Sequence, residues 1–68
     1  MRDQLEKLVL EMLDRGVLYD DARREFEKMF ITRALQRSNG SVGDAAVLLG
    51  LHRNTVARKM TEYRIKRT

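Results

Sequence analysis

The sequence predicts an all-α protein whose subunit contains four helices. Apolar residues recur at helical spacing in successive segments, which is the main sequence signal of amphipathic helices. Helix-stopping residues separate these segments at Gly16, Asn39-Gly40 and Gly50, and the chain contains no proline. A chain of 68 residues without cysteine forms one domain at most and buries little apolar surface. Association with a second copy is therefore the remaining common source of stability.

The first helix is expected at about residues 2–14. One apolar stripe follows the spacing i, i+3, i+4, i+7 and i+8, and its members are Leu5, Leu8, Val9, Met12 and Leu13. Gly16 then stands where a left-handed residue commonly caps a helix. The pattern predicts a helix with one buried face.

The second helix is expected to begin at Asp20 or Asp21, either of which can cap it, and to end near Ser38. At about 100° per residue its apolar positions cover roughly two-thirds of the circumference. They are Ala22, Phe26, Met29, Phe30, Ile31, Ala34 and Leu35. Such a helix needs partners on more than one side. We favour a second copy of the chain as one partner; the alternative is a central helix wrapped by the other three helices of its own chain.

The third helix is expected at residues 42–49. Ser41 is a good N-cap, and Asp44 lies where a capping-box acid reaches back, although aspartate is shorter than the usual residue. Gly50 makes the following turn, because glycine tolerates positive φ. Leu51 is expected to fill the core between the third and fourth helices.

The fourth helix is expected from His52 or Arg53 to Tyr63. Val56, Met60 and Tyr63 point inward in this pattern. The outward positions are Asn54, Thr55, Arg58, Thr61 and Glu62, with His52 and Arg53 at the exposed start. Residues 64–68 form a basic end that we expect to be frayed.

Charge divides the chain into two unlike halves. Residues 1–31 hold six basic and eight acidic residues, a balance of −2, whereas residues 32–68 hold eight basic and two acidic residues, a balance of +6. A basic half suggests a polyanionic partner for that end. The alternative is a basic tail, Arg64, Lys66 and Arg67, that is only solvated.

The last two helices predict a helix-turn-helix that places its second helix, at about residues 52–63, in the major groove of DNA. Arg53 is the first choice for base readout, because a guanidinium can pair with guanine O6 and N7; a phosphate contact or a salt bridge to Asp44 is the alternative. The candidate DNA-binding residues are Ser41, His52, Arg53, Asn54, Thr55, Arg58, Lys59 and Thr61.

Several of these candidates have competing roles that the sequence leaves open. Ser41 and Asn54 can serve as helix caps, and the Thr55 hydroxyl can bond back within its helix. Lys59 is either a phosphate contact or solvated charge. His52 is expected to make a neutral polar contact at the helix start, the alternative being a pH sensor.

Other function classes lack their signatures. The chain has one histidine and no cysteine, so a zinc site is not expected, and no catalytic set or phosphate-cradling loop predicts an enzyme or a cofactor. No stretch approaches the ~18–20 apolar residues of a membrane span. We expect a cytoplasmic protein without membrane contact.

The second half of the chain resembles the Fis family of bacterial DNA-binding proteins, especially the C-terminal domains of nitrogen-regulator-class enhancer-binding activators. The similar pattern is Ala45-Ala46-x-Leu48-Leu49-Gly50 followed by Arg53-Asn54-Thr55-Val56-x-Arg58-Lys59-Met60-x-Glu62-Tyr63. Upstream, Glu25-Phe26-Glu27 through Ala34-Leu35 and Asn39-Gly40 resemble the long helix that precedes this motif. The specific match covers about residues 20–65. Ala57 departs from the pattern, since some relatives carry a longer polar or basic residue there.

The resemblance implies a homodimer in which the first two helices of each subunit form a dimeric bundle and the last two form the helix-turn-helix. It assigns residues 1–40 to dimerisation and residues 41–68 to DNA binding. The implied interface residues are Leu5, Leu8, Val9, Met12, Leu13, Phe26, Met29, Phe30 and Ile31. It also implies DNA bending and a role as a transcription regulator or nucleoid protein.

Two alternatives stay open at this stage. The chain is either a short stand-alone protein or a fragment of a larger activator with upstream regulatory domains. Its basic helix also fits an adaptor that binds an acidic protein partner.

Overall fold

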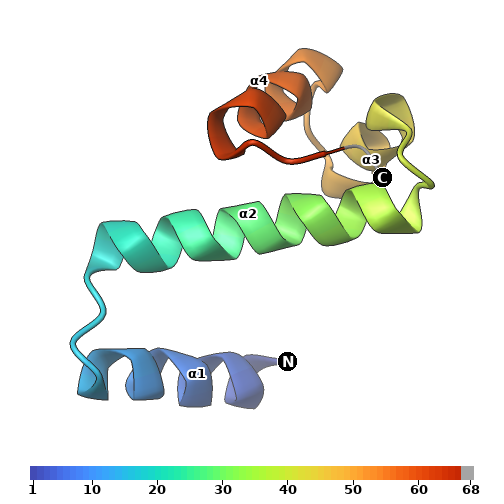
Figure 1. Ribbon diagram of the computed structural model, residues 1–68. Helices are drawn as coiled ribbons and strands as arrows, with labels where there is room; N and C mark the ends of the chain where they lie inside the picture. Colours follow the sequence, from blue (N-terminus) through green and yellow to red (C-terminus); the bar gives the residue numbers. More distant parts are fainter. Residues whose placement is uncertain (67–68) are drawn as a thin grey trace.

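The computed structural model describes residues 1–66 and contains four helices in that range (Figure 1). They are α1 (Arg2–Asp14), α2 (Tyr19–Arg37), α3 (Val42–Leu49) and α4 (Arg53–Tyr63). The all-α prediction is confirmed, and the bounds of the third and fourth helices agree with those expected. Helix α2 is the longest element, and Figure 1 shows α3 and α4 gathered on one side of it while α1 runs along its other side.

Each helix ends in a left-handed turn that returns two backbone N–H groups to its last carbonyls. After α1 the N–H groups of Gly16 and Val17 donate to the carbonyls of Leu13 and Met12. The turns after α2 and α3 place Asn39 and Gly50 at φ 54° and φ 72°. These pairs of bonds are the Schellman arrangement, which satisfies carbonyls that the helix itself leaves free.

The core of the subunit lies where the C-terminal half of α2 meets α3 and α4. Its buried members are Ile31, Ala34, Leu35, Ala45, Ala46, Val56 and Met60, with Val42, Leu49 and Ile65 packed against them. Ala45 and Ala46 are nearly inaccessible, and their small side chains allow α3 to approach its neighbours closely. The helix-turn-helix is therefore held on α2 by apolar packing.

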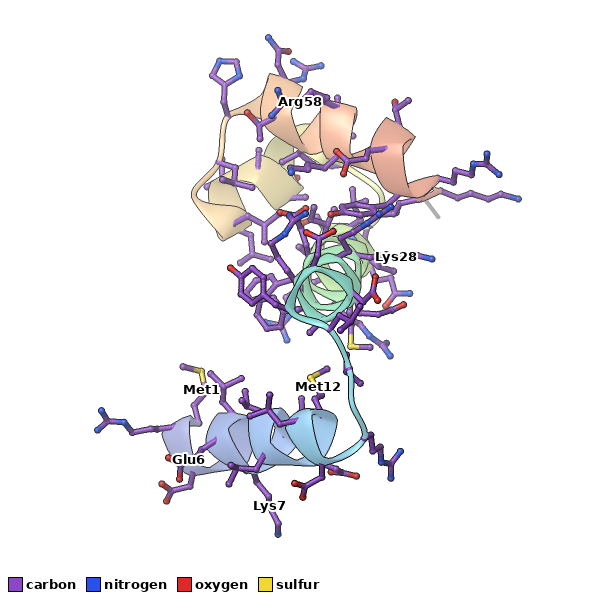
Figure 2. The ribbon with its side chains drawn as sticks, turned by 90° about the vertical axis from the view of Figure 1, so that its left-hand side faces the viewer. Met1, Glu6, Lys7, Met12, Lys28 and Arg58 are labelled. Carbon is purple, nitrogen blue, oxygen red and sulfur yellow. The ribbon has the colours of Figure 1, made fainter. Side chains whose placement is uncertain are left out.

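Helix α1 contributes no buried residue to this core. The stripe expected to face inward remains exposed in the subunit, with Leu8 at 48% and Leu13 at 65% of their accessible surface. Figure 2 shows α1 as a separate layer, from which Lys7 points away from the rest of the molecule. The alternative in which α2 is wrapped by the other helices of its own chain is thus not what the structure shows.

Four details of the sequence prediction need correction. Leu18 is the N-cap residue of α2, so Asp20 and Asp21 lie within its first turn and do not cap it. Ile31 is only 3% exposed and packs in the subunit's own core, which leaves it no surface for a dimer interface. Leu51 is 43% exposed and does not fill the core.

The fourth correction concerns the end of the chain. Arg64 takes φ 55°, its N–H donates to the Thr61 carbonyl, and the Ile65 N–H donates to the Met60 carbonyl at 2.9 Å. Ile65 also packs against the core. Residues 64 and 65 are thus anchored rather than frayed, while Arg67 lies outside the described residues.

Candidate nucleic-acid interface

Helices α3 and α4 each begin after a residue whose side chain caps the first turn. Ser41 caps α3, because its Oγ accepts a hydrogen bond from the Asp44 N–H at 3.2 Å. The Ser41 N–H donates to the Ser38 carbonyl, so the return bond of a capping box is replaced by a backbone bond. His52 caps α4, with its Nδ1 accepting from the Asn54 N–H at 3.0 Å. The caps fix where each helix begins.

The outward side of α4 presents a row of polar side chains. Arg53, Asn54 and Arg58 are exposed, and within residues 1–66 their side chains make no hydrogen bond or ion pair with the rest of the subunit. The alternative of an Arg53–Asp44 salt bridge is therefore absent from the described residues. Figure 2 shows Arg58 on the side of the molecule far from α1. These donors are available to an external partner.

Two other predicted contacts are engaged within the subunit. The Thr61 hydroxyl donates to the Ala57 carbonyl at 3.3 Å within α4. The Lys59 ammonium lies 3.1 Å from Glu27 Oε1 on α2, and its side chain is only 21% exposed. Lys59 is thus neither solvated charge nor a free donor. Thr55 is half-buried on the same flank of α4, near Glu27 and Phe26.

Glu27 is the centre of a polar cluster that joins α2 to α4. Besides Lys59, its Oε1 accepts a hydrogen bond from the Tyr63 hydroxyl and lies 3.8 Å from Nη1 of Arg23. Arg23 in turn donates to Asp20 at 3.0 Å. Tyr63 is 8% exposed, which confirms it as a core anchor. The cluster attaches both the middle and the end of α4 to the long helix.

The protonation of this cluster follows from its hydrogen bonds. The Tyr63 hydroxyl, followed by the Lys59 ammonium and the Arg23 guanidinium, lowers the pKa of Glu27 below its ordinary value against the opposing effect of burial. Donation to Glu27, with burial added, raises the pKa of Tyr63. Near neutral pH the pair therefore keeps a carboxylate acceptor and a phenol donor.

The opposite flank of α4 carries a basic hollow that extends to the start of α3. Three cations line it, Arg53, Arg64 and Lys66, together with the small side chain of Ala57 and the apolar Val42 and Ile65. The sequence alone did not assign Arg64 or Lys66 to the site. The sequence shows that both residues are basic, but it does not predict the turn that brings them beside Arg53.

The residues expected at a dimer interface are concentrated on the exposed parts of α1 and α2. The rings of Phe26 and Phe30 contact each other in a tilted arrangement at a centroid distance of 5.3 Å, and these residues and Met29 are each more than half exposed. Phe26, Met29 and Phe30 line an apolar groove together with Leu48 and Leu49 of α3. Apart from the buried Ile31 and the half-buried Met12, the predicted interface residues are thus left exposed by the subunit itself.

The described residues hold no group of three or more potential metal ligands. None of the helices in residues 1–66 has the length and apolar character needed to cross a membrane.

Comparison with known proteins places these features in a family. The family described as "Bacterial regulatory protein, Fis family" matches residues 22–63. A protein of Xylella fastidiosa described as a Fis-like DNA-binding protein is 37% identical over 54 residues, which are 79% of this chain and 60% of that protein. The chain thus spans less than two thirds of this relative's length. No solved structure matches the sequence.

Proposed function

The chain belongs to the Fis family of bacterial regulatory proteins, and from this premise we propose that it binds double-stranded DNA as a homodimer. In this proposal α4 enters the major groove and the protein acts as a non-enzymatic transcription regulator or a DNA-bending protein of the bacterial nucleoid. The observation that carries the proposal is the row of exposed, unpaired donors on α4, Arg53, Asn54 and Arg58.

The roles of these donors follow from their positions on α4. Arg53 lies in the first turn, the part of a recognition helix that reaches base edges, and we assign it to base readout. Arg58 lies one turn beyond Asn54 and can reach a base or the backbone. His52 and Ser41 stand at the starts of α4 and α3, where polar groups can dock phosphates. Thr55 serves as a lesser backbone contact, Thr61 contributes one only when its hydroxyl turns away from the Ala57 carbonyl, and Lys59 contributes through its pairing with Glu27.

The homodimer is supported by what the subunit leaves uncovered. An isolated helix of 13 residues is marginal in water, so α1 needs tertiary packing to persist. Its stripe of Leu5, Leu8, Val9 and Leu13 is exposed, and so are Phe26 and Phe30 on α2. In a two-fold dimer, the exposed surface of α1 and α2 in one subunit would pack against the same surface of the second subunit. We place residues 1–40 in this interface and residues 41–68 in DNA binding.

The first experiment is a fluorescence-anisotropy titration of labelled duplex pools at two salt concentrations, followed by sequencing of the bound fraction. Phosphate contacts predict a steep loss of affinity with salt. Enrichment of a two-fold-symmetric motif would support a site-specific regulator, whereas salt-sensitive binding without enrichment would support a shape-reading nucleoid protein. No binding at low salt would contradict the proposal and would favour the alternative of an adaptor that binds an acidic protein partner.

Substitution of Arg53 tests the assignment of base readout. Arg53→Ala is expected to weaken binding to the selected sequence by roughly 10-fold or more, since a bidentate base contact discriminates by ~1–3 kcal/mol. Binding to unrelated duplex should fall much less. Equal losses of affinity for both duplexes would mean that Arg53 contacts phosphates and does not read bases.

A further inference from the structure

The basic hollow beside α4 brings together cations from both ends of that helix. Arg53 comes from the first turn of α4, whereas Arg64 and Lys66 come from the turn that follows it. Ala57 lies between them and leaves space that a longer side chain would fill. These charged residues are far apart in the sequence, but α4 and the turn that follows it place them around one depression.

The charges in this hollow are not balanced by the residues that the structure describes. Within residues 1–66, no carboxylate lines it. In the part of the chain that the structure describes, the side chains of Arg53, Arg64 and Lys66 make no ion pair or hydrogen bond. The other flank of α4 differs, because Lys59 is paired there with Glu27. The hollow therefore concentrates positive charge that an external anion could neutralise.

The turn that carries Arg64 and Lys66 is held in place. Two backbone hydrogen bonds close it, and Ile65 packs on the core between the two cations. Arg64 adopts φ 55°, a left-handed conformation that favours glycine, so an arginine here carries a conformational cost. Anchoring reduces the freedom that these side chains would lose on binding.

We infer that this hollow is a binding site for the DNA sugar–phosphate backbone, with Arg64 and Lys66 as phosphate-binding residues beyond the helix-turn-helix. The inference rests on the proposed function and deepens it. Ala57 and Thr61 line the hollow and are exposed beside the outward row of α4. A strand that borders the groove entered by α4 therefore passes over the hollow, while Arg53 reaches from its rim toward the bases.

The other flank of α4 is a poorer position for a phosphate strand. A second depression there is lined by Asp21, Glu25 and Glu62 as well as by Arg24, Lys28 and Arg64, so Arg64 borders both depressions. Its carboxylates would repel phosphates and offset its cations. The asymmetry predicts that backbone contacts extend from α4 toward the hollow with Arg64 and Lys66 and not toward α2.

The test compares two variants that lose the same number of charges. Arg64→Asn with Lys66→Gln removes two of the three cations of the hollow and keeps Arg53, and asparagine tolerates the left-handed turn. Arg24→Gln with Lys28→Gln is the matched control on the other flank. Each protein is titrated with one selected duplex over a series of salt concentrations, and phosphate ethylation interference maps the contacted phosphates. Circular dichroism and sedimentation verify the fold and the dimer.

We expect the log–log salt slope of the Arg64/Lys66 variant to become shallower by about 3.6, since the dimer loses two phosphate contacts in each subunit and each lost contact changes the slope by about 0.9. Ethylation interference should vanish at the matching phosphates of each half-site, and the control should retain both slope and pattern. Equal slopes for the two variants would overturn the inference. Failure of the unmodified protein to bind DNA would instead overturn the proposed function.

If the Arg64/Lys66 double variant does not fold, a single substitution still tests the inference. Lys66→Gln changes an exposed side chain outside α4 and should leave the fold intact. Its slope should become shallower by about 1.8, because the dimer loses one contact in each subunit, and an unchanged slope would overturn the assignment of Lys66.

Discussion

The two halves of the subunit differ in where their apolar side chains go. Among the described residues, every buried side chain lies between Ile31 and Tyr63, and none lies in residues 1–30. The second half has a core of its own, built from the end of α2, α3 and α4. The first half has comparable apolar content but no partner within the chain. The proposed homodimer accounts for this contrast, since association would cover the apolar surface of the first half, whereas internal packing covers that of the second.

The largest expected effect is on the first half. Leu8→Asp should place a charge in the shared apolar surface and cost about 3 kcal/mol or more, abolishing the dimer or unfolding the protein. Sedimentation equilibrium measures the loss. Lys7→Gln changes the net charge by the same unit on the side of α1 that points away from α2, and should remain dimeric (Figure 2). A fully folded, DNA-binding Leu8→Asp dimer would refute the interface; Phe30→Asp is the corresponding variant on α2.

In the second half, removal of a core side chain should act through packing. Leu35 is 1% exposed, so Leu35→Ala is expected to cost about 2–5 kcal/mol. Val47 lies on α3 but is 82% exposed, and Val47→Ala should change stability by less than about 0.5 kcal/mol. Urea unfolding of both variants at one protein concentration measures the difference. Similar costs would mean that the core has been placed wrongly.

The Glu27 cluster, which joins the two halves, should make a smaller contribution that depends on pH. Because folding lowers the pKa of Glu27, its stabilisation is present above the unfolded value of about 4.3 and is lost as pH falls through the folded pKa. Glu27→Gln should cost about 1 kcal/mol at pH 7. Thermal melts of variant and wild type should converge below pH 4. Glu25→Gln, an exposed neighbour, is the control, and a pH-independent difference would count against the carboxylate's role.

An effect of similar size is expected at the cap of α3. Ser41→Ala should cost about 1 kcal/mol and Ser41→Gly only a few tenths, the order expected for an N-cap. The same variants separate capping from DNA contact. If the hydroxyl also donates to a phosphate, affinity falls in both variants while the salt slope stays the same, since a neutral group displaces no counterion. Unchanged affinity would leave Ser41 as a cap alone.

The sequence predicted the helices well because their limits are encoded locally. Ser41 before α3 and the residues Gly16, Asn39 and Gly50 after the first three helices have conformational preferences that act within one turn. The outward row of Arg53, Asn54 and Arg58 also follows from the period of one helix. Such features need no knowledge of the rest of the chain.

The remaining features depend on contacts between distant residues. The period of α2 showed how much of its surface is apolar but not which side meets α3 and α4, so Ile31 was assigned to the wrong surface. The pairing of Lys59 with Glu27 joins residues on different helices and has no local signal. The anchored end of the chain is not predictable from its sequence, because arginine seldom adopts a left-handed conformation. The turn at Arg64 depends on the hydrogen bond from the Ile65 N–H to the Met60 carbonyl, which has no sequence signal.

The cap of α4 also determines which ring nitrogen of a neutral His52 carries the proton. A neutral imidazole whose Nδ1 accepts the Asn54 N–H must carry its proton on Nε2. The exposed edge of this ring is then a donor and not an acceptor. In the proposed DNA complex it can serve a phosphate oxygen, guanine O6 or N7, adenine N7 or thymine O4, but it cannot receive the amino groups of adenine or cytosine. The tautomer selected inside the turn would therefore disfavour cytosine, which offers only a donor there.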